Sequence, residues 1–167
     1  KKGMVAMKGS YHGKSFGALS LTFNPKYRKA FSPLVEKVSF ASFGDMDSLR
    51  SVIDEDTACI ILEPIQGESG IIVAPDGFLQ EVRNLCNEKG ILLIFDEIQA
   101  GLGRTGRLWA GEHWNTTPDI LCLAKGIAGG VPMGATLVRP DILAAISKGE
   151  HSSTFGGNPI SCAAGIA

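Results

Sequence analysis

Uninterrupted apolar runs alternate with helical patterns along this chain, and this alternation restricts the folds that it can adopt. The apolar runs lie at 57–65, 91–97, 119–124 and 135–139. Segments 45–54 and 77–90 instead carry apolar residues every three or four positions, which is typical of a helix with one buried face. Strands without polar alternation are buried on both faces. We therefore expect an α/β fold, a mainly parallel sheet with helices on both faces.

Local signals place the ends of several elements. Gly90 is well placed to end the helix over 77–90. Asp45 or Asp47 is the expected cap of the helix over 45–54. Further strands are expected within 4–11 and 35–43. A helix is also expected over 140–149, because a proline opens it and a glycine closes it.

Composition excludes some classes of function. The net charge of −1 and the scattered basic residues argue against a nucleic-acid or membrane surface. No apolar run reaches the length of a membrane span. The four cysteines lack the short spacings of zinc sites, so we predict no metal site and interpret them as free thiols of a reducing, cytoplasmic compartment.

Both ends of the chain predict that it is part of a longer protein. It opens at Lys1 without an initiator methionine and closes in "NPISCAAGIA", a helical pattern without a stop signal. We expect 1–167 to form part of one domain, since this length suits a single core.

Three successive strands end in polar residues. Glu63 ends the run at 57–65, Asp96 ends that at 91–97 and is followed by Gln99, and Lys125 follows 119–124. Ligands of parallel α/β sheets gather at the carboxyl ends of the strands. We therefore expect these side chains to share one edge of the sheet.

The chemistry of these residue types suits one cofactor. A partly desolvated lysine loses its proton readily and attacks an aldehyde. An aspartate that faces a pyridine nitrogen keeps that nitrogen protonated, which makes the ring an electron sink. Gln99 can donate to a ring oxygen, and Tyr11 can stack on the ring. The set matches pyridoxal phosphate, although spacing alone does not establish it.

A rival interpretation is dinucleotide binding, because "GLGRTG" at 101–106 satisfies the pattern G-x-G-x-x-G. The context is poor, since Asp96, Glu97 and Gln99 separate the strand from the first glycine. Those acids would also place negative charge beside a pyrophosphate. A ribose-binding acid is missing about 20 residues further on. We therefore favour the acid over the glycine loop as the functional feature.

Five motifs together resemble one family. They are "SYHGKSFGALSLT", "EPIQGESG", "LLIFDEIQAGLGRTG", "DILCLAKGIAGGVPMGA" and "STFGGNP". In this order and spacing, the chain resembles class III pyridoxal-phosphate-dependent aminotransferases of the acetylornithine/ornithine type. The resemblance implies part of a fold type I large domain with a seven-stranded, mainly parallel sheet. It also implies an N-terminal cofactor-binding loop and a C-terminal small domain outside 1–167.

The resemblance implies catalytic and cofactor roles for particular residues. Lys125 would bond the cofactor aldehyde and then carry the proton of the reaction, and Asp96 would pair with the pyridine nitrogen. Gln99 would lie at the ring hydroxyl, while Tyr11 and Ile98 would pack on opposite faces of the ring. Glu63 and His12 are expected to support the site, His12 through a structural hydrogen bond.

Three further residues resemble family positions that contact substrate or a second subunit. Thr154 resembles the threonine that reaches the cofactor phosphate of the neighbouring subunit, which implies a homodimer with shared sites. Glu68 resembles an acid that pairs with a later arginine. Lys14 stands where the family commonly has an arginine that contacts a substrate carboxylate, and a lysine lacks the planar two-point fork of that arginine.

The implied reaction is amino transfer from an acetylornithine- or ornithine-like donor, or a lysine-pathway intermediate, to 2-oxoglutarate by a ping-pong mechanism. Such an enzyme would serve arginine or lysine biosynthesis. The alternatives are a 4-aminobutyrate-type or other class III enzyme, and a non-catalytic domain that keeps only the fold and the dimer surface. We expect the fragment alone to be poorly active or inactive.

Overall fold

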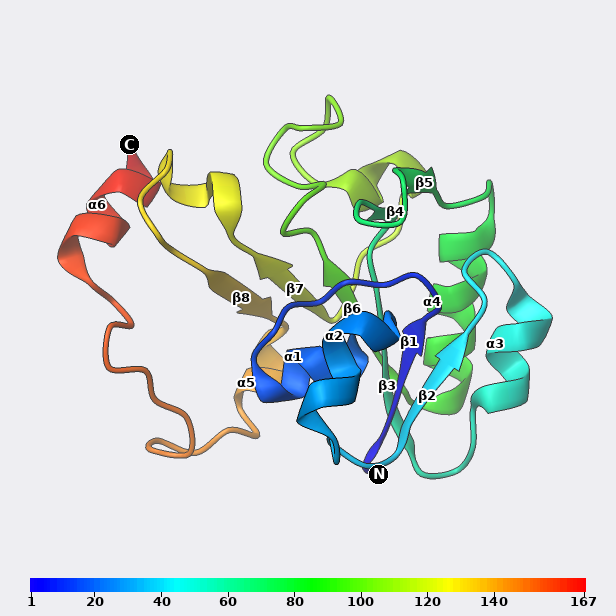
Figure 1. Cartoon of the computed structure of the whole chain (residues 1–167). Helices are drawn as coiled ribbons and strands as arrows, with labels where there is room; N and C mark the ends of the chain where they lie inside the picture. The colour runs from blue at the N-terminus through cyan, green and yellow to red at the C-terminus, as the bar shows by residue number, and fades with distance from the viewer.

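A computed structural model describes all residues of the chain, 1–167, as a six-stranded sheet with flanking helices (Figure 1). The strands are β1 (Gly3–Met7), β2 (Val38–Ala41), β3 (Thr57–Leu62), β4 (Ile65–Gln66), β5 (Ile72–Val73), β6 (Leu92–Asp96), β7 (Ile120–Leu123) and β8 (Ala135–Val138). The α-helices are α1 (Phe16–Leu21), α2 (Pro25–Arg28), α3 (Met46–Val52), α4 (Phe78–Lys89), α5 (Pro140–Leu143) and α6 (Pro159–Ile166). Short 3₁₀ helices are η1 (Lys29–Phe31), η2 (Ala110–Trp114) and η3 (Lys125–Ala128).

The main sheet is parallel except at one edge. Its strand order is β2-β1-β3-β6-β7-β8, and only β8 runs antiparallel to its neighbour, with Cys122 opposite Thr136. The connection from β7 to β8 contains only η3, which is too short for the crossover of a dozen or more residues that a parallel pair needs. The predicted α/β class is confirmed, and within residues 1–167 the sheet has six strands, while the resemblance implied seven.

One face of the sheet carries the main core. The helices α3 and α4 pack on it, while α1 and α2 lie on the other side of β1 (Figure 1). Alternate residues of each strand point to the same face, so Ile60, Leu93 and Phe95 meet α4. These three side chains are fully buried, and their burial stabilises this layer together with the other residues of the same core.

The helix α4 confirms the predicted pattern. Phe78, Leu79, Val82, Leu85 and Cys86 form its buried face. It ends where Gly90 turns into the left-handed region with φ of 59°, and the Gly90 N–H donates to the Cys86 carbonyl. A residue without a side chain adopts this conformation without strain, which explains why the helix stops there.

Two predicted elements are shorter than expected. The strand predicted within 4–11 ends at Met7, because Gly9 turns with φ of +84° and a β-carbon there would collide with Ser69 and Gln66. The helix predicted over 140–149 is helical only at α5. Leu143 and Ile146 are about half exposed, so no apolar surface stabilises its continuation.

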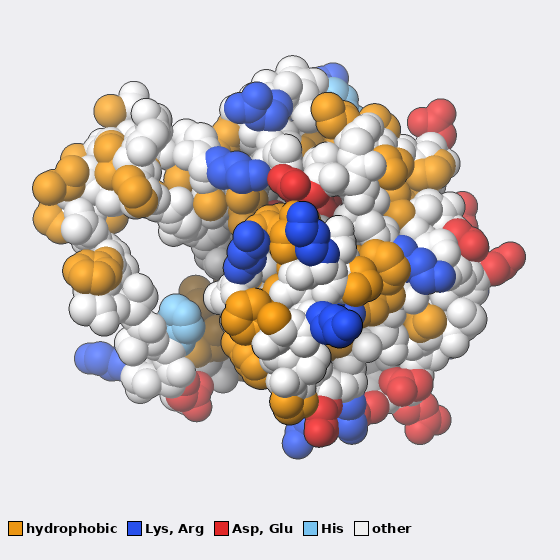
Figure 2. Space-filling view, viewed as in Figure 1, with side chains coloured by type: hydrophobic (Ala, Val, Ile, Leu, Met, Phe, Trp, Pro, Cys, Tyr) orange, Lys and Arg blue, Asp and Glu red, His pale blue; other side chains and the backbone are white.

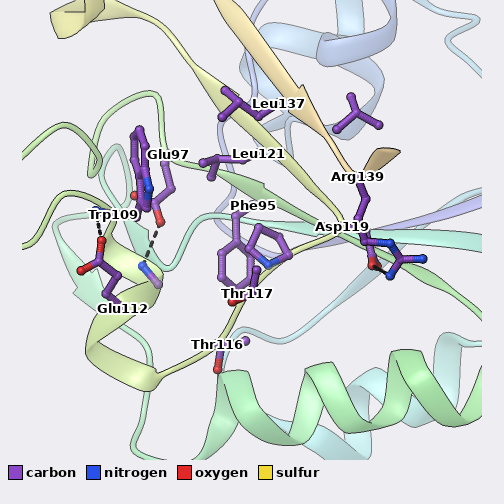
Figure 3. Close-up of a pocket in the computed structure, with 13 residues that line it drawn as sticks. Phe95, Glu97, Trp109, Glu112, Thr116, Thr117, Asp119, Leu121, Leu137 and Arg139 are labelled. Atoms are coloured by element: carbon purple, nitrogen blue, oxygen red, sulfur yellow. Dashed lines mark hydrogen bonds and ion pairs between the residues drawn. The ribbon is translucent and has the colours of Figure 1, made fainter. Parts of the chain in front are cut away.

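Asp119 joins four elements at the amino end of β7. One carboxylate oxygen accepts from the Arg83 guanidinium of α4 at 2.9 Å and from the Leu93 N–H of β6 at 2.8 Å. The other accepts from Arg139, which follows β8, at 2.6 Å (Figure 3). Asp119 itself is 4% exposed. The carboxylate therefore fixes the positions of α4 and β8 relative to β6 and β7.

No helix of this structure combines the length and the apolar character that crossing a bilayer requires.

Replacing Asp119 by Ala should destabilise the whole protein by about 3 kcal/mol, because it leaves the Arg83 charge and the Leu93 N–H without their partner. Urea unfolding of the whole protein measures this loss. The matched control is Asp47→Ala, since Asp47 pairs with Arg50 only in full solvent exposure. Equal effects of the two substitutions would contradict the anchoring role of Asp119.

Candidate active site

The carboxyl ends of three adjacent parallel strands form one side of a small cavity. The strands β3, β6 and β7 are neighbours in the sheet, so Glu63, Asp96 and Lys125 come to the same edge, as predicted. The cavity has a volume of about 80 Å³. Its lining comprises Tyr11, His12, Gly13, Glu63, Asp96, Ile98, Gln99 and Lys125.

Asp96 is the buried acid of this cavity. It is the last residue of β6, and 6% of it is exposed. One carboxylate oxygen accepts from the Ile98 N–H at 3.1 Å, and the other lies 2.8 Å from Nδ1 of His12. Because an ionised carboxylate only accepts, Nδ1 of His12 carries the proton of this contact. His12 therefore donates a buried hydrogen bond to Asp96.

Hydrogen bonds join the two ends of the loop that carries His12. The His12 N–H donates to Oγ1 of Thr22 at 2.9 Å, and that hydroxyl donates to the Gly13 carbonyl at 3.1 Å. The Phe23 N–H donates to the Ser10 carbonyl at 3.0 Å. These bonds bring both ends of residues 10–23 together and hold the imidazole against Asp96.

Glu63 orients the backbone around the cavity. Its two carboxylate oxygens accept from the Tyr11 N–H at 3.0 Å and from the Gly67 N–H at 3.1 Å. Burial raises the pKa of this carboxyl above its usual value, and the two backbone donors oppose that rise. Glu63 thus fixes the position of the Tyr11 backbone at the cavity.

Gln99 packs against a residue that has no side chain. A β-carbon at Gly67 would overlap the Gln99 amide. Gly67 therefore leaves the space in which Gln99 reaches the cavity. The sequence singled out Gln99 but not this dependence, because nothing in the spacing of 67 and 99 predicts their contact.

Lys125 reaches the cavity from a strained backbone. It opens η3 directly after β7, and its φ of 46° lies in the left-handed region. Residues with a β-carbon adopt this region at a cost of about 1–2 kcal/mol. Such strain collects at functional positions that the surrounding fold over-determines. The side chain is exposed at the rim, whereas Asp96 is buried.

Three predicted residues do not line this cavity. Lys14 is exposed, and its ammonium lies over the ring of Tyr27. Glu68 lines a neighbouring cavity of about 360 Å³, which shares Tyr11 with the first one. Thr154 is exposed in the segment between α5 and α6, which extends away from the sheet (Figure 1).

Glu97, next to Asp96, serves the fold. It is 1% exposed, and its carboxylate accepts from the Ala110 N–H at 2.6 Å and from the Gly111 N–H at 2.8 Å. Successive residues at a strand end point to opposite faces, which separates the two neighbouring acids. Glu97 holds the chain that returns from the glycine loop at 101–106, and this loop opens no helix. The dinucleotide alternative therefore lacks its structural context.

A third cavity, of about 250 Å³, lies on the core face of the sheet beside β7 and β8 (Figure 3). Phe95, Leu121, Leu137 and Trp109 supply its apolar walls. Each of its three acids has a partner in the fold, since Glu97 holds two backbone N–H groups, Glu112 accepts from the Trp109 N–H and Asp119 holds two arginines.

The first cavity fits pyridoxal phosphate by its set of donors. It offers a buried carboxylate for a ring nitrogen, an exposed amine for an aldehyde, and an aromatic and an aliphatic side chain for the two ring faces. Nε2 of the buried His12 has no hydrogen-bond partner within the chain, which leaves a polar atom available beside the ring site. The residues present are therefore consistent with the cofactor that the sequence predicted.

Comparison with protein families gives one match along the whole chain. The family model described as "Aminotransferase class-III" matches residues 1–167.

Individual relatives carry related names. The chain is 51% identical to the acetylornithine aminotransferase of Methanopyrus kandleri, over 96% of this chain and 41% of that protein. It is 48% identical to the putrescine aminotransferase of Pectobacterium atrosepticum, over 98% of this chain and 37% of that protein. The chain therefore spans about two fifths of the length of these curated relatives.

A solved structure shares the fold. The ornithine aminotransferase of Toxoplasma gondii, whose active site is described as partly occupied by pyridoxal phosphate, superposes with a TM-score of 0.94 at 37% identity. The match covers 98% of this chain and 39% of that one.

Two substitutions of Lys125 separate the contribution of its amine to activity from the cost of its left-handed backbone to stability. Lys125→Ala and Lys125→Gly should both abolish turnover in the whole protein, because both remove the amine. Lys125→Gly should be the more stable of the two by about 1 kcal/mol, because glycine relieves the left-handed strain. Thermal unfolding in the absence of cofactor measures this difference, and a more stable alanine variant would contradict the backbone conformation.

Glu97 should make stability depend on pH. Burial raises the pKa of its carboxyl above the ordinary value of 4.5, so the folded state keeps a proton that the unfolded chain releases. Its contribution to the free energy of unfolding therefore falls as pH rises through and above 4.5. The advantage of the wild type over Glu97→Gln should shrink between about pH 4 and 7 in urea titrations. The exposed Glu88→Gln serves as control, and a growing advantage would refute the direction of the shift.

Proposed function

Because this chain belongs to the class-III aminotransferase family, whose members depend on pyridoxal phosphate, we propose that the whole protein transfers the terminal amino group of an acetylornithine- or ornithine-like donor to 2-oxoglutarate. The observation that carries the proposal is that Asp96 and Lys125 line one cavity from neighbouring strands. The names of two relatives support the donor class.

The proposed roles follow from the contacts of each side chain. When bound, pyridoxal phosphate supplies an aldehyde that bonds amines and a ring that accepts an electron pair. Asp96, which His12 and the Ile98 N–H hold in place, would keep a proton on the ring nitrogen. Charge placed in advance of the reaction in a dry site is worth far more than charge in water.

Lys125 would move the proton. Its amine is at the rim of the cavity, and Asp96 is buried in its wall. The amine would take the proton from the substrate carbon next to the reacting nitrogen and return it to the adjacent cofactor carbon. Positioned proton transfer of this kind contributes about 10²–10⁴-fold to a rate. Donor and acceptor would react in turn at the same site, which gives ping-pong kinetics.

The other lining residues would orient the ring. Tyr11 and Ile98 would pack on its two faces, and Gln99 would donate to its hydroxyl oxygen. Lys14 and Glu68 would contact the substrate. Thr154 does not line this cavity in its own chain, so we propose that it acts in a neighbouring subunit of a homodimer.

The cell compartment and pathway are part of the proposal. All four cysteines are free, which suits a reducing, cytoplasmic setting. An acetylornithine donor would place the enzyme in arginine biosynthesis, and a lysine-pathway intermediate would place it in lysine biosynthesis. A 4-aminobutyrate-type donor is the alternative within the same family.

The test is amino transfer by the whole protein. Loaded with pyridoxal phosphate, it should form glutamate from 2-oxoglutarate fastest with acetylornithine or ornithine among donors that include 4-aminobutyrate and putrescine. Asp96→Asn should lower kcat by about 10²–10³-fold, because the ring nitrogen loses its charged partner. The exposed Asp76→Asn should retain full activity.

Two results would overturn this proposal. The absence of glutamate with every donor would favour a non-catalytic domain. A clear preference for 4-aminobutyrate would move the protein to the alternative donor class.

A further inference from the structure

Tyr27 lies between Lys14, which the sequence predicts to contact the substrate, and Tyr11 of the cavity. Its ring packs edge-on against the ring of Tyr11, with centroids 5.6 Å apart and planes at 74°. The Lys14 ammonium lies 5.0 Å from the centroid of the Tyr27 ring. Tyr11 lines the cavity that contains Asp96 and Lys125. The two aromatic rings therefore form a continuous path from the ammonium to the site.

The backbone holds Tyr27 firmly in this place. Residues 10–23 form the closed loop described above, so the chain re-emerges beside Tyr11 and enters α2. Oδ1 of Asn24 accepts from the Lys26 N–H at 3.0 Å and caps α2, and Pro25 opens the helix. The Tyr27 N–H donates to the Asn24 carbonyl at 3.1 Å. These bonds fix the backbone from which the Tyr27 ring projects, and the ring itself packs against Tyr11.

Lys14 is free to meet a carboxylate. None of the ion pairs of the chain involves it. A lysine side chain is flexible and carries about 2 kcal/mol of rotamer entropy. A contact that already restricts this side chain lowers the entropy that is lost when its ammonium binds a carboxylate. The negative face of an aromatic ring restricts an ammonium without neutralising it. The contact with Tyr27 restricts the Lys14 ammonium in this way and leaves its charge available for a carboxylate.

The outer surface near α1 and α2 favours an anion. Lys and Arg side chains gather over the part of the surface where α1 and α2 lie (Figure 2). The neighbouring cavity of about 360 Å³, which Tyr11 and Glu68 line, has that acid as its only charged residue. A donor carboxylate would be repelled there, so it would instead meet the Lys14 ammonium outside that cavity.

We propose that Tyr27 is a positioning residue that holds the Lys14 ammonium beside Tyr11, so that the enzyme distinguishes donors with a carboxylate at their far end from donors without one. This inference rests on the proposed function. Tyr27 acts through Lys14 and touches neither substrate nor cofactor in this role.

The experiment compares two donors that differ only by the carboxylate, N2-acetylornithine and N-acetylputrescine, with the whole holoenzyme. In wild type, the KM for acetylornithine should be the lower one. Tyr27→Leu should raise that KM about threefold to tenfold, leave kcat unchanged and leave the KM for acetylputrescine unchanged. Tyr27→Phe should restore wild-type values, because the ring face is retained. Phe31→Leu, which removes an exposed aromatic ring on η1, is the matched control.

A double-mutant cycle tests whether Tyr27 acts through Lys14. Lys14→Met should raise the KM for acetylornithine, and adding Tyr27→Leu to it should have no further effect. Tyr27→Met, which fills the space without a ring, should reproduce Tyr27→Leu, so the test does not depend on the folding of one variant.

Three results would overturn the inference: equal losses with both donors, a Tyr27→Phe variant as impaired as Tyr27→Leu, or a Tyr27→Leu effect that persists without Lys14. A wild type that transfers no amine from either donor would instead overturn the proposed function itself.

Discussion

The buried contact between the His12 imidazole and the Asp96 carboxylate joins the two parts from which the site is built. Asp96 belongs to the rigid sheet, while His12 belongs to a loop that returns on itself through Thr22. Each oxygen of the carboxylate has one partner, His12 for one and the Ile98 N–H for the other, and these contacts orient it. The same loop presents Tyr11 and leads into Tyr27, so the geometry of the aromatic residues depends on this contact as well.

Buried carboxylates do most of the ordering around the site, each for a different part of the chain. Glu63 holds the backbone at Tyr11 and Gly67, and Glu97 holds the return of the glycine loop. Asp119 holds α4 and β8 to the sheet from the opposite end of β7. Because these acids are satisfied by the fold, the remaining polar groups of the cavity stay available for a ligand.

The sequence predicts the sheet and the edge at which the site lies, because both follow from periodicity. Runs such as 57–62 and 92–96 are strands, and their order along the chain places Glu63, Asp96 and Lys125 together. The sequence does not predict contacts that arise from loop closure, such as Tyr27 against Tyr11, since no period relates these positions. The sequence singles out Asp96 and assigns no role to Glu97, whose contacts with the Ala110 and Gly111 N–H groups arise where the chain returns from the glycine loop. The helix expected over 140–149 is cut short because propensity alone does not maintain a helix without a surface to pack on.

The left-handed backbone of Lys125 has a consequence for how this sequence tolerates change. Thermal stability and activity favour different residues at that position. Glycine would relieve the backbone strain, whereas the reaction requires the lysine amine. Directed evolution that screens only for survival at high temperature would therefore drift toward an inert enzyme at residue 125, and a stabilised library needs an activity screen to keep its lysine.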